Sequence, residues 1–429
     1  MEYRELLNEL ESYFRVGETE EQKIGVEIEH FVVDKNGLRT ITYQEQNGIE
    51  DLLYQLQAKG WQGKKEEGNL IQLSSSQADI TLEPGGQVEL GIYPCAEIKE
   101  LEEVYDQFLQ DLIPILEEYN YYLISLGYQP ASKINQIAWN PKQRYKIMSD
   151  YFNEKGQYAH NMMKGTAAFQ IALDYESEQD FIDKFRVANF LSPVLSILLD
   201  NAPIFEGQIY DKQALRTLIW NHTDPTRTGV VQESFASDFD YRKYAEYILS
   251  KESILIKQDK SYQATGSQTN RQVFAQRDFC LQDLEHILTM VFPDVRAKQF
   301  IEIRMADSLP PELSFALVSF WKGLFYNQAS LDKAVNFSKL FRLEDVLEAK
   351  EAIIKQGVKT KLGDYDILEI ASKYINWAKA GLKEVELEYL KPLEELVRER
   401  KTPASRLKER LRQENKKEAI KPCILNYKL

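Results

Sequence analysis

Acidic side chains recur on stretches of this chain that alternate apolar and polar residues. In residues 24–30 (IGVEIEH), Glu27 and Glu29 alternate with apolar residues. Successive side chains of a β-strand point to opposite faces, so these two carboxylates share a face about 7 Å apart. The same alternation recurs in three further segments: residues 80–90 with Glu83 and Glu89, residues 169–174 with Gln170, and residues 300–305 with Glu302 and Arg304.

A sheet with one solvent-exposed face produces the same alternation, so each strand taken alone has a simpler explanation. Taken together, however, the carboxylates would repel one another, and their burial without partners is costly. Divalent cations would offset that repulsion. Oxygen ligands without cysteine favour Mg²⁺ or Mn²⁺ over zinc. Because Mg²⁺ commonly completes its shell from substrate phosphate, the pattern points onward to a nucleoside triphosphate such as ATP.

Groups that bind phosphate should then lie elsewhere on the chain. The sequence contains neither a Walker A motif nor G-x-G-x-x-G, so the simple P-loop and Rossmann interpretations are unsupported. The cationic candidates are Arg227, Arg304, Arg216, Arg186 and Lys164. A surface or ion-pair role is the alternative for each of them. Arg304 and Arg227 are the better candidates, because one shares a face with Glu302 and the other lies in a Gly/Thr loop whose amides could bind anions.

Strands and helices must position these groups. Short alternating strands and amphipathic helices fill residues 1–330, and an almost entirely helical pattern fills residues 331–429. We therefore expect an α+β catalytic domain followed by a helical C-terminal region packed on it. The expected helices of the first part are 96–119, 177–200 (with Ser177 as N-cap), 240–249, 281–292 and 312–327. The polar segments 224–236 and 258–272 are expected to be loops.

Composition excludes several classes of protein. The 67 acidic and 53 basic residues give a formal charge of −14, which argues against a general nucleic-acid binder. No apolar stretch is long enough to span a bilayer, so no membrane association is expected. The start of the chain (MEYRELLNEL) does not resemble a signal peptide, and the 3 cysteines lie far apart. Both features are typical of a reducing compartment, and we expect the cytoplasm.

Six ordered motifs resemble the plant-type glutamate–cysteine ligase family. They are GVEIE at 25–29, TLEPGGQVEL at 81–90, TAAFQIALD at 166–174, NAPIFEG at 201–207, DPTRTG at 224–229, and FPDVR at 292–296 followed by EIR at 302–304. The resemblance implies a fold related to glutamine synthetase, in which an antiparallel sheet curves into a funnel lined by carboxylates. It also implies ATP-dependent joining of the γ-carboxylate of L-glutamate to the amine of L-cysteine, the first step of glutathione biosynthesis.

The resemblance implies roles for individual residues as well. The expected metal-site residues are Glu27, Glu29, Glu83, Glu89, Gln170 and Glu302. Arg304 and Arg227 are expected at phosphate with Lys164 as a further candidate, and Arg216 and Trp220 near the amino-acid substrates. The sequence departs from the plant pattern at Gly165, where the plant enzymes have Arg, and at Ala172, where they have Asn. Both departures are expected near the substrate pocket, where they would bear on amino-acid specificity.

Two alternatives stay open from the sequence. A related ligase could join a different acid or a different amine. A relative without catalytic activity could bind nucleotide or metal as a regulator. The sequence does not specify the oligomeric state.

Overall fold

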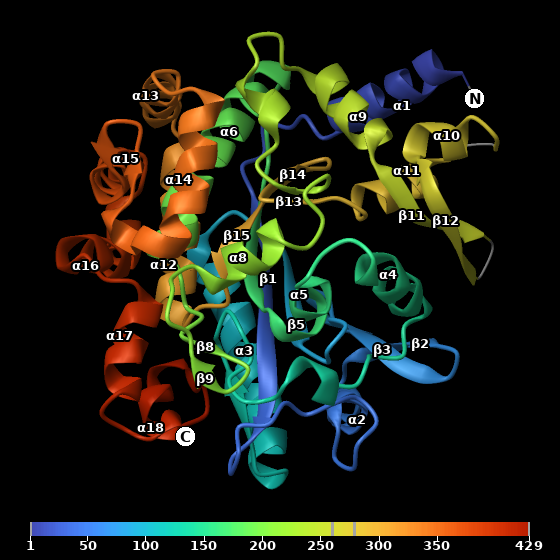
Figure 1. Ribbon diagram of the computed structural model, residues 1–429, viewed down its shortest axis with the longest axis vertical. Helices are drawn as coiled ribbons and strands as arrows, with labels where there is room; N and C mark the ends of the chain where they lie inside the picture. The colour runs from blue at the N-terminus through green and yellow to red at the C-terminus, as the bar shows by residue number, and fades with distance from the viewer. Residues whose placement is uncertain (1, 259–260, 278–279, 428–429) are drawn as a thin grey trace.

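An antiparallel sheet forms the centre of the computed structural model, which describes residues 2–258, 261–277 and 280–427 (Figure 1). Its strands follow the order β14-β15-β7-β1-β5-β4-β3-β2, and β6 pairs with the far half of β1. All of these pairings are antiparallel. The bounds are β1 (Ile24–Asp34), β2 (Gln62–Glu66), β3 (Asn69–Ser74), β4 (Ala78–Leu82), β5 (Val88–Cys95), β6 (Tyr121–Ile124), β7 (Ala168–Leu173), β14 (Val295–Ala297) and β15 (Ile301–Asp307).

Helices surround the sheet, and those of the C-terminal region gather along one side of it (orange to red in Figure 1). The first part of the chain contains α1 (Tyr3–Val16), α2 (Ile49–Ala58), α3 (Ile98–Glu118), α4 (Gln143–Asn153), α5 (Ala159–Gly165), α6 (Glu178–Phe190), α7 (Ser192–Leu198), α8 (Leu215–Asn221), α9 (Tyr241–Ser250), α10 (Asn270–Phe274), α11 (Leu281–Leu288) and α12 (Pro311–Phe325). The C-terminal region contains α13 (Gln328–Ser338), α14 (Leu343–Gln356), α15 (Ile367–Ala380), α16 (Lys391–Glu399), α17 (Pro403–Leu411) and α18 (Lys416–Ala419). No helix in the described ranges is both long and apolar enough to cross a bilayer.

Short elements connect these helices and strands. They are the strand pairs β8 (Ile204–Phe205) with β9 (Gln208–Ile209), β10 (Thr228–Gly229) with β13 (Phe292–Pro293), β11 (Glu252–Gln258) with β12 (Ser261–Thr269), and β16 (Lys361–Leu362) with β17 (Tyr365–Asp366). The 3₁₀ segments are Ile134–Gln136, Gln232–Phe235, Gly357–Lys359, Glu384–Leu390 and Lys421–Cys423.

The apolar face of the sheet packs into the main hydrophobic core. Ile28 of β1 and Leu90 of β5 belong to the same buried cluster as Phe315 of α12. That cluster continues into the C-terminal helices through Ile353 of α14 and Ile370 of α15. Burial of this apolar surface stabilises the sheet and the C-terminal helices together. The division of the chain at residue 330 remains a prediction.

His30 shows how the apolar face fixes the direction of β1. Its ring is fully buried, with Nε2 3.0 Å from the hydroxyl of Tyr105 and Nδ1 3.3 Å from that of Ser125. Burial lowers the pKa of His30 to about 3, so the ring is neutral. Because side chains alternate along the strand, an inward His30 leaves Glu29 facing the opposite side.

The expected α+β architecture with an antiparallel sheet is confirmed, and Ser177 caps α6 by accepting from the Asp180 amide at 3.3 Å. The single helix expected at 177–200 breaks near Leu191 into α6 and α7. The loop expected at 258–272 is wrong: most of it forms β12 and the start of α10, with residues 259 and 260 outside the described ranges. Hydrogen bonds to β11 hold a segment that its polar, turn-rich composition disfavours as a strand.

Candidate functional site

The register of the sheet brings acidic side chains from distant segments onto one face. Glu29 of β1 lies directly opposite Glu89 of β5. Glu27 of β1 lies directly opposite Gln170 of β7, and Glu302 of β15 lies diagonally across from Gln170. Residues that lie opposite each other in an antiparallel pair have Cβ atoms about 4.5–5.5 Å apart on the same face. Strand pairing therefore produces the carboxylate row that the sequence predicts.

Glu83 joins this row from the tight turn between β4 and β5. Gly86 in the turn has a φ of +85°, which favours glycine. A Cβ on Gly85 would lie 2.5 Å from a backbone oxygen of α5, so this position also needs glycine. The Gln87 side chain accepts from the Gly85 amide at 2.9 Å and donates to the Thr166 carbonyl at 2.8 Å. The EPGGQ segment thus holds Glu83 beside the sheet through a fixed turn.

Two cavities open on this face and meet at Glu27, Glu89 and Gln170, which line both. The first, of about 210 Å³, is covered by α4, α5 and α8, and we call it the arginine cavity. Its lining also includes Glu29, Glu83, Arg144, Tyr145, Arg216, Trp220, Arg296 and Arg304. The second, of about 260 Å³, lies toward the other end of the same strands, and we call it the glycine cavity. Its lining also includes Gly25, Thr81, Gly91, Tyr93, Ala172, Phe300 and Glu302.

Negative charge is crowded where the two cavities meet. Burial, with repulsion from Glu89 and Glu302, raises the pKa of Glu27 to about 7. Burial and the charge of Glu83 raise the pKa of Glu89 to about 7 as well. Burial also raises the pKa values of Glu29 and Glu83. Within the described residues, the Glu27 carboxylate accepts no hydrogen bond and has no ion-pair partner. Nearby cations, such as Arg304 beside Glu27 and Arg216 beside Glu29, lower these pKa values but do not outweigh burial and repulsion. The negative charge of the row is therefore compensated only in part.

Glu302 differs from the other four carboxylates, because cations surround it. Arg296 binds it through two hydrogen bonds, from Nε at 2.6 Å and from Nη2 at 2.9 Å. Lys298 lies 3.3 Å away and Arg304 3.1 Å away. Burial would raise the pKa of Glu302, but these charges outweigh burial and hold it well below its usual range. Its predicted role as a metal ligand remains a prediction, and in the structure this carboxylate orients arginines.

Arg304 occupies a β-bulge of β15, where it and Met305 together oppose the single residue Gln170 of β7. Its Nη1 donates to the side-chain oxygen of Gln170. Arg216 of α8 donates to the Arg304 carbonyl at 3.1 Å, and its guanidinium lies 5.5 Å from the ring centre of Trp220. The Nε of Arg216 and the Nε1 of Trp220 are buried without a partner among the described residues. Both side chains line the arginine cavity, although these two nitrogens themselves expose almost no surface to it.

Sequence reasoning missed two arginines of this cavity. Arg144 of α4 lines it, and its Nε is buried without a partner in the part of the chain that the structure describes. Arg296 lines it too, although the sequence named it only within a motif. The sequence gives no signal for Arg144, since its helix has no other recognisable chemistry. Arg296 could have been found from strand register, because it lies directly opposite Glu302.

The structure does not bring Arg227 into either cavity. Its guanidinium is fully buried and pairs with Asp224 at 2.7 Å, and it also donates to the Met290 carbonyl at 2.7 Å and to the Tyr151 hydroxyl at 2.6 Å. These bonds use the donors that a phosphate would need. The predicted role of Arg227 at phosphate remains a prediction that its position does not favour.

Lys164 and Arg186 also bind within the protein. The Lys164 ammonium donates to the Ile137 carbonyl at 2.8 Å and lies 4.6 Å from the ring centre of Trp139. Arg186 donates to the Phe235 carbonyl at 3.1 Å. Neither residue lines the arginine cavity or the glycine cavity.

The two departures from the plant pattern fall in different places. Gly165 lines neither cavity, and a Cβ there would lie 2.6 Å from the ring of Tyr128, so packing explains this glycine. Ala172 lines the glycine cavity. Neither position lines the arginine cavity, which contains Arg216 and Trp220, the residues expected near the amino-acid substrates.

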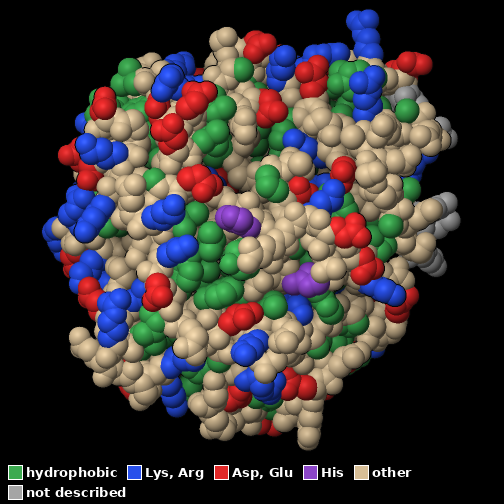
Figure 2. All heavy atoms as spheres, viewed as in Figure 1, with side chains coloured by type: hydrophobic (Ala, Val, Ile, Leu, Met, Phe, Trp, Pro, Cys, Tyr) green, Lys and Arg blue, Asp and Glu red, His purple; other side chains and the backbone are tan. Residues whose placement is uncertain are grey.

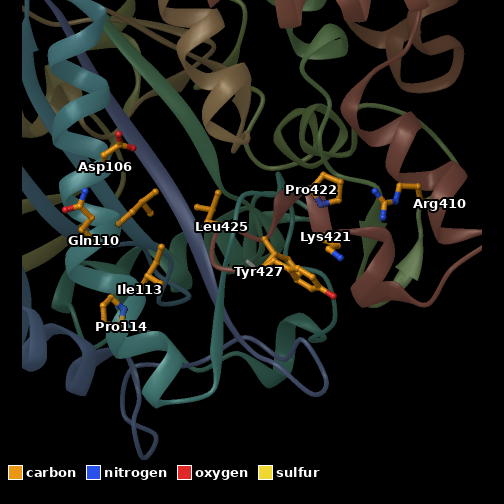
Figure 3. Close-up of a pocket in the computed structure, with 11 residues that line it drawn as sticks. Asp106, Gln110, Ile113, Pro114, Arg410, Lys421, Pro422, Leu425 and Tyr427 are labelled. Carbon is orange, nitrogen blue, oxygen red and sulfur yellow. The ribbon is translucent and has the colours of Figure 1, made fainter. Parts of the chain in front are cut away.

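A larger cavity, of about 850 Å³, is a separate groove between α3 and the C-terminal segment (Figure 3). Ile113 and Pro114 of α3 face Leu425 and Tyr427 across it, and none of the clustered carboxylates reaches it. On the face shown in Figure 2, acidic and basic side chains are interspersed, without a broad basic surface. The clustered carboxylates and arginines thus line the paired cavities and not this groove.

No group of three or more His, Cys, Asp or Glu side chains in the described residues is arranged to hold a metal ion on its own. The carboxylates instead approach one another in pairs across strands, as Glu29 and Glu89 do. Mg²⁺ suits such an arrangement, because it commonly binds one or two protein carboxylates and completes its shell with water and phosphate. The donor set fits a hard divalent cation bound together with a phosphorylated ligand.

Comparison with known proteins places the chain in a family. The model of Glutamate-cysteine ligase family 2 matches residues 23–425. The chloroplastic glutamate–cysteine ligase of Medicago truncatula is 31% identical over 398 residues, which cover 90% of this chain and 78% of that protein. The chloroplastic enzyme of Arabidopsis thaliana is also 31% identical, covering 90% of this chain and 76% of that protein.

The chain belongs to this glutamate–cysteine ligase family. A solved glutamate–cysteine ligase from Francisella tularensis, in complex with AMP, is similar in fold, with a TM-score of 0.60 and 14% identity over 95% of this chain and 88% of that one. The resemblance seen in the six motifs is thereby confirmed.

The expected cytoplasmic location is wrong by the same comparisons, because the named plant ligases are chloroplastic. Free cysteines are compatible with any reducing compartment, so they could not single out the cytoplasm.

Glu27→Gln should stabilise the ligase at pH 8 in the presence of EDTA. The folded-state pKa of Glu27, about 7, lies above its ordinary value, so the folded state holds an extra proton between about pH 4.5 and 7. Protonation of Glu27 stabilises the folded state fully at low pH, and this stabilisation is lost as the pH rises through 7. Urea unfolding should show the variant on the order of 1–3 kcal/mol more stable than wild type at pH 8, and no more stable at pH 4.5. A wild type that is the more stable protein at pH 8 would contradict the crowded-carboxylate interpretation.

Proposed function

We propose that this protein is an ATP-dependent ligase that joins the γ-carboxylate of L-glutamate to the amine of L-cysteine, the first step of glutathione biosynthesis. Membership of the family supports this activity. The structural observation that carries it is the carboxylate row at Glu27, Glu29, Glu83 and Glu89, which borders a cavity lined by arginines. A reaction that transfers a phosphoryl group needs both a place for divalent cations and fixed positive groups.

Mg²⁺ or Mn²⁺ would be held by Glu27, Glu29, Glu83 and Glu89, whose charge the cations of the protein offset only in part. When bound, the ion would neutralise phosphate oxygens during transfer. Gln170 lies opposite Glu27 and donates to Glu29 at 3.1 Å, so it would position both the metal site and Arg304.

The two cavities suit different substrates. The arginine cavity contains Arg144, Arg216 and Arg304, whose guanidinium groups match the carboxylates of glutamate and the transferring phosphoryl group. In the glycine cavity, Gly25 and Gly91 have no side chain and lie beside the ring of Tyr93, which suits the flat base of a nucleotide. ATP would enter through the glycine cavity with its phosphates directed toward the shared carboxylates.

Amide formation from a free acid and an amine is uphill in water, so the acid must first be activated. A γ-carboxylate oxygen of glutamate attacks the γ-phosphorus of ATP, and ADP leaves. The cysteine amine then attacks the acyl carbon, loses a proton, and phosphate leaves. The protein contributes mainly position and charge, because the phosphoryl group carries negative charge throughout the transfer. Arg304, held by Glu302 and Gln170, stabilises that charge.

A substrate screen would distinguish two other functions from this one: a ligase with another acid or amine, and a non-catalytic relative that binds nucleotide or metal. The two departures from the plant pattern give no specific support to another amine, since neither lies in the arginine cavity.

The substrate pair can be established by a screen for ADP formation. Purified protein with ATP, Mg²⁺ and glutamate should form ADP rapidly only when cysteine is added, because the acyl phosphate needs an amine acceptor to turn over. Each proteinogenic amino acid is tested in place of cysteine, and acetate in place of glutamate serves as the acid control. Turnover with a different amine alone would replace cysteine in the proposal. Tight binding of ATP with no ADP under any mixture would favour the non-catalytic alternative.

Arg304→Ala and Glu302→Gln should each lower kcat by about 10²–10³, the loss typical of removing one charge-stabilising group. Arg304 would lose contact with the phosphoryl group, and Glu302→Gln would weaken the hold on Arg296 and Arg304. The matched control is Arg406→Ala on α17, an ion-paired arginine near the surface, which should keep kcat within twofold. Near-normal kcat in either site variant, with the fold verified by circular dichroism, would remove Arg304 from the mechanism.

Gly91→Val should raise the KM for ATP at least fivefold and leave the KM for glutamate unchanged. Position 91 lies opposite Glu27, so a new side chain would enter the glycine cavity. Its Cβ would lie 3.9 Å from the backbone oxygen of Asp79, which is an ordinary contact distance, so the strand can accept it. Steady-state kinetics with each substrate varied in turn measures both constants. A rise confined to the KM for glutamate would reverse the assignment of the two cavities.

A further inference from the structure

A lysine of the C-terminal helical region lies behind the arginine cavity in a buried polar cluster. Lys350 of α14 is 5% exposed. Its ammonium forms an ion pair with Asp294 and lies 3.0 Å from the hydroxyl of Ser192, the first residue of α7. Ser192 donates to the same Asp294 oxygen at 2.6 Å. We call these three residues the Lys350 cluster.

The Lys350 cluster connects directly to the bulge that carries Arg304. The Asp294 backbone carbonyl accepts from the Arg304 amide at 2.9 Å, and the Asp294 amide donates to the Gly229 carbonyl at 2.8 Å. Because Arg304 sits in a bulge, its backbone lies outside the regular pairing of β15 with β7. The bond from the Arg304 amide to the Asp294 carbonyl continues the register of β14 with β15 by one residue, so Asp294 holds Arg304 from the side of β15 that faces away from β7.

We infer that Lys350 is a positioning residue, which fixes Asp294 and through it the bulge that aims Arg304 into the arginine cavity. This inference rests on the proposed function only for its kinetic consequence. The Arg304 backbone is held on its amide side by Asp294 and on its carbonyl side by Arg216 at 3.1 Å. If Lys350 were lost, Asp294 would lose its charged partner inside the protein and its backbone would shift toward new contacts.

This arrangement gives the C-terminal helical region a role in the reaction. The ion pair crosses from α14 to the segment between β13 and β14, and it joins residues 56 positions apart in sequence. Arg296, which binds Glu302 through two hydrogen bonds, follows two residues after Asp294 in β14. Helix α14 thus fixes, through Asp294, the backbone near both Arg296 and Arg304, while it lines neither cavity.

The test compares Lys350→Met with a matched control, Lys408→Met. Lys408 of α17 is 4% exposed and donates to the Lys212 carbonyl, and it has no bond to the Lys350 cluster or to β15. Two readouts are taken at 20 °C on protein whose folded fraction has been measured: amide hydrogen exchange of residues 301–307, and steady-state kinetics with ATP, glutamate and cysteine.

In Lys350→Met, the Arg304 amide should exchange at least tenfold faster than in wild type, while the amides of α3 keep their protection. The value of kcat should fall about 10- to 100-fold, as a misplacement near 1 Å can cost, with KM values within threefold. Lys408→Met should match wild type in both readouts. A second variant, Ser192→Ala, should shift both in the same direction by a smaller factor, and it replaces Lys350→Met if that protein does not fold.

Unchanged exchange at Arg304 in the folded variant would overturn the inference, whatever the kinetics show. Faster exchange with unchanged kcat would also overturn it, because the bulge would then not control Arg304. If wild-type protein forms no ADP with any substrate, the proposed function is contradicted instead. The exchange result at Arg304 would still decide whether Lys350 holds the bulge.

Discussion

Repulsion among carboxylates on one face of the sheet is the constraint on which the rest of this structure depends. The antiparallel register forces Glu29 against Glu89 and places Glu27 beside Gln170, and the turn adds Glu83. Unfolded, these side chains would be solvated and far apart. Folding buries and concentrates them, and burial together with repulsion raises their pKa values at a cost in free energy. The apolar face of the same strands, packed into the main core, offsets that cost.

The protein treats its acidic residues in two ways. Glu302 is surrounded by Arg296, Lys298 and Arg304, so its charge is compensated within the fold. Glu27 has no ion pair among the described residues, and the more distant Lys298 and Arg304 lower its pKa without outweighing burial and repulsion. A site that pairs one carboxylate with three cations and compensates the others only in part is arranged to keep its arginines fixed and to accept positive charge from outside. That division supports phosphoryl transfer better than a structural salt-bridge network.

The sequence predicted the acidic face well, because strand alternation is a local property that residues 24–30 and 80–90 display plainly. It favoured Arg227 together with Arg304, because Arg227 lies in a Gly/Thr loop, yet the Arg227 guanidinium is buried and bonds to Asp224. Arg144 was missed, because its place over the sheet depends on how α4 packs. The hairpin at β12 was missed for a related reason, since its pairing with β11 outweighs a loop-like composition.

The most direct test of the central claim is binding of Mn²⁺ in the presence of a non-hydrolysable ATP analogue at pH 7, followed by electron paramagnetic resonance together with proton release. The account predicts that Mn²⁺ and the analogue bind together and that protons leave the protein, because the ion displaces those held by carboxylates with pKa values near 7. The double variant Glu27→Gln/Glu89→Gln should lose both signals. Equal Mn²⁺ binding by that variant, or binding by wild type without proton release, would contradict the account.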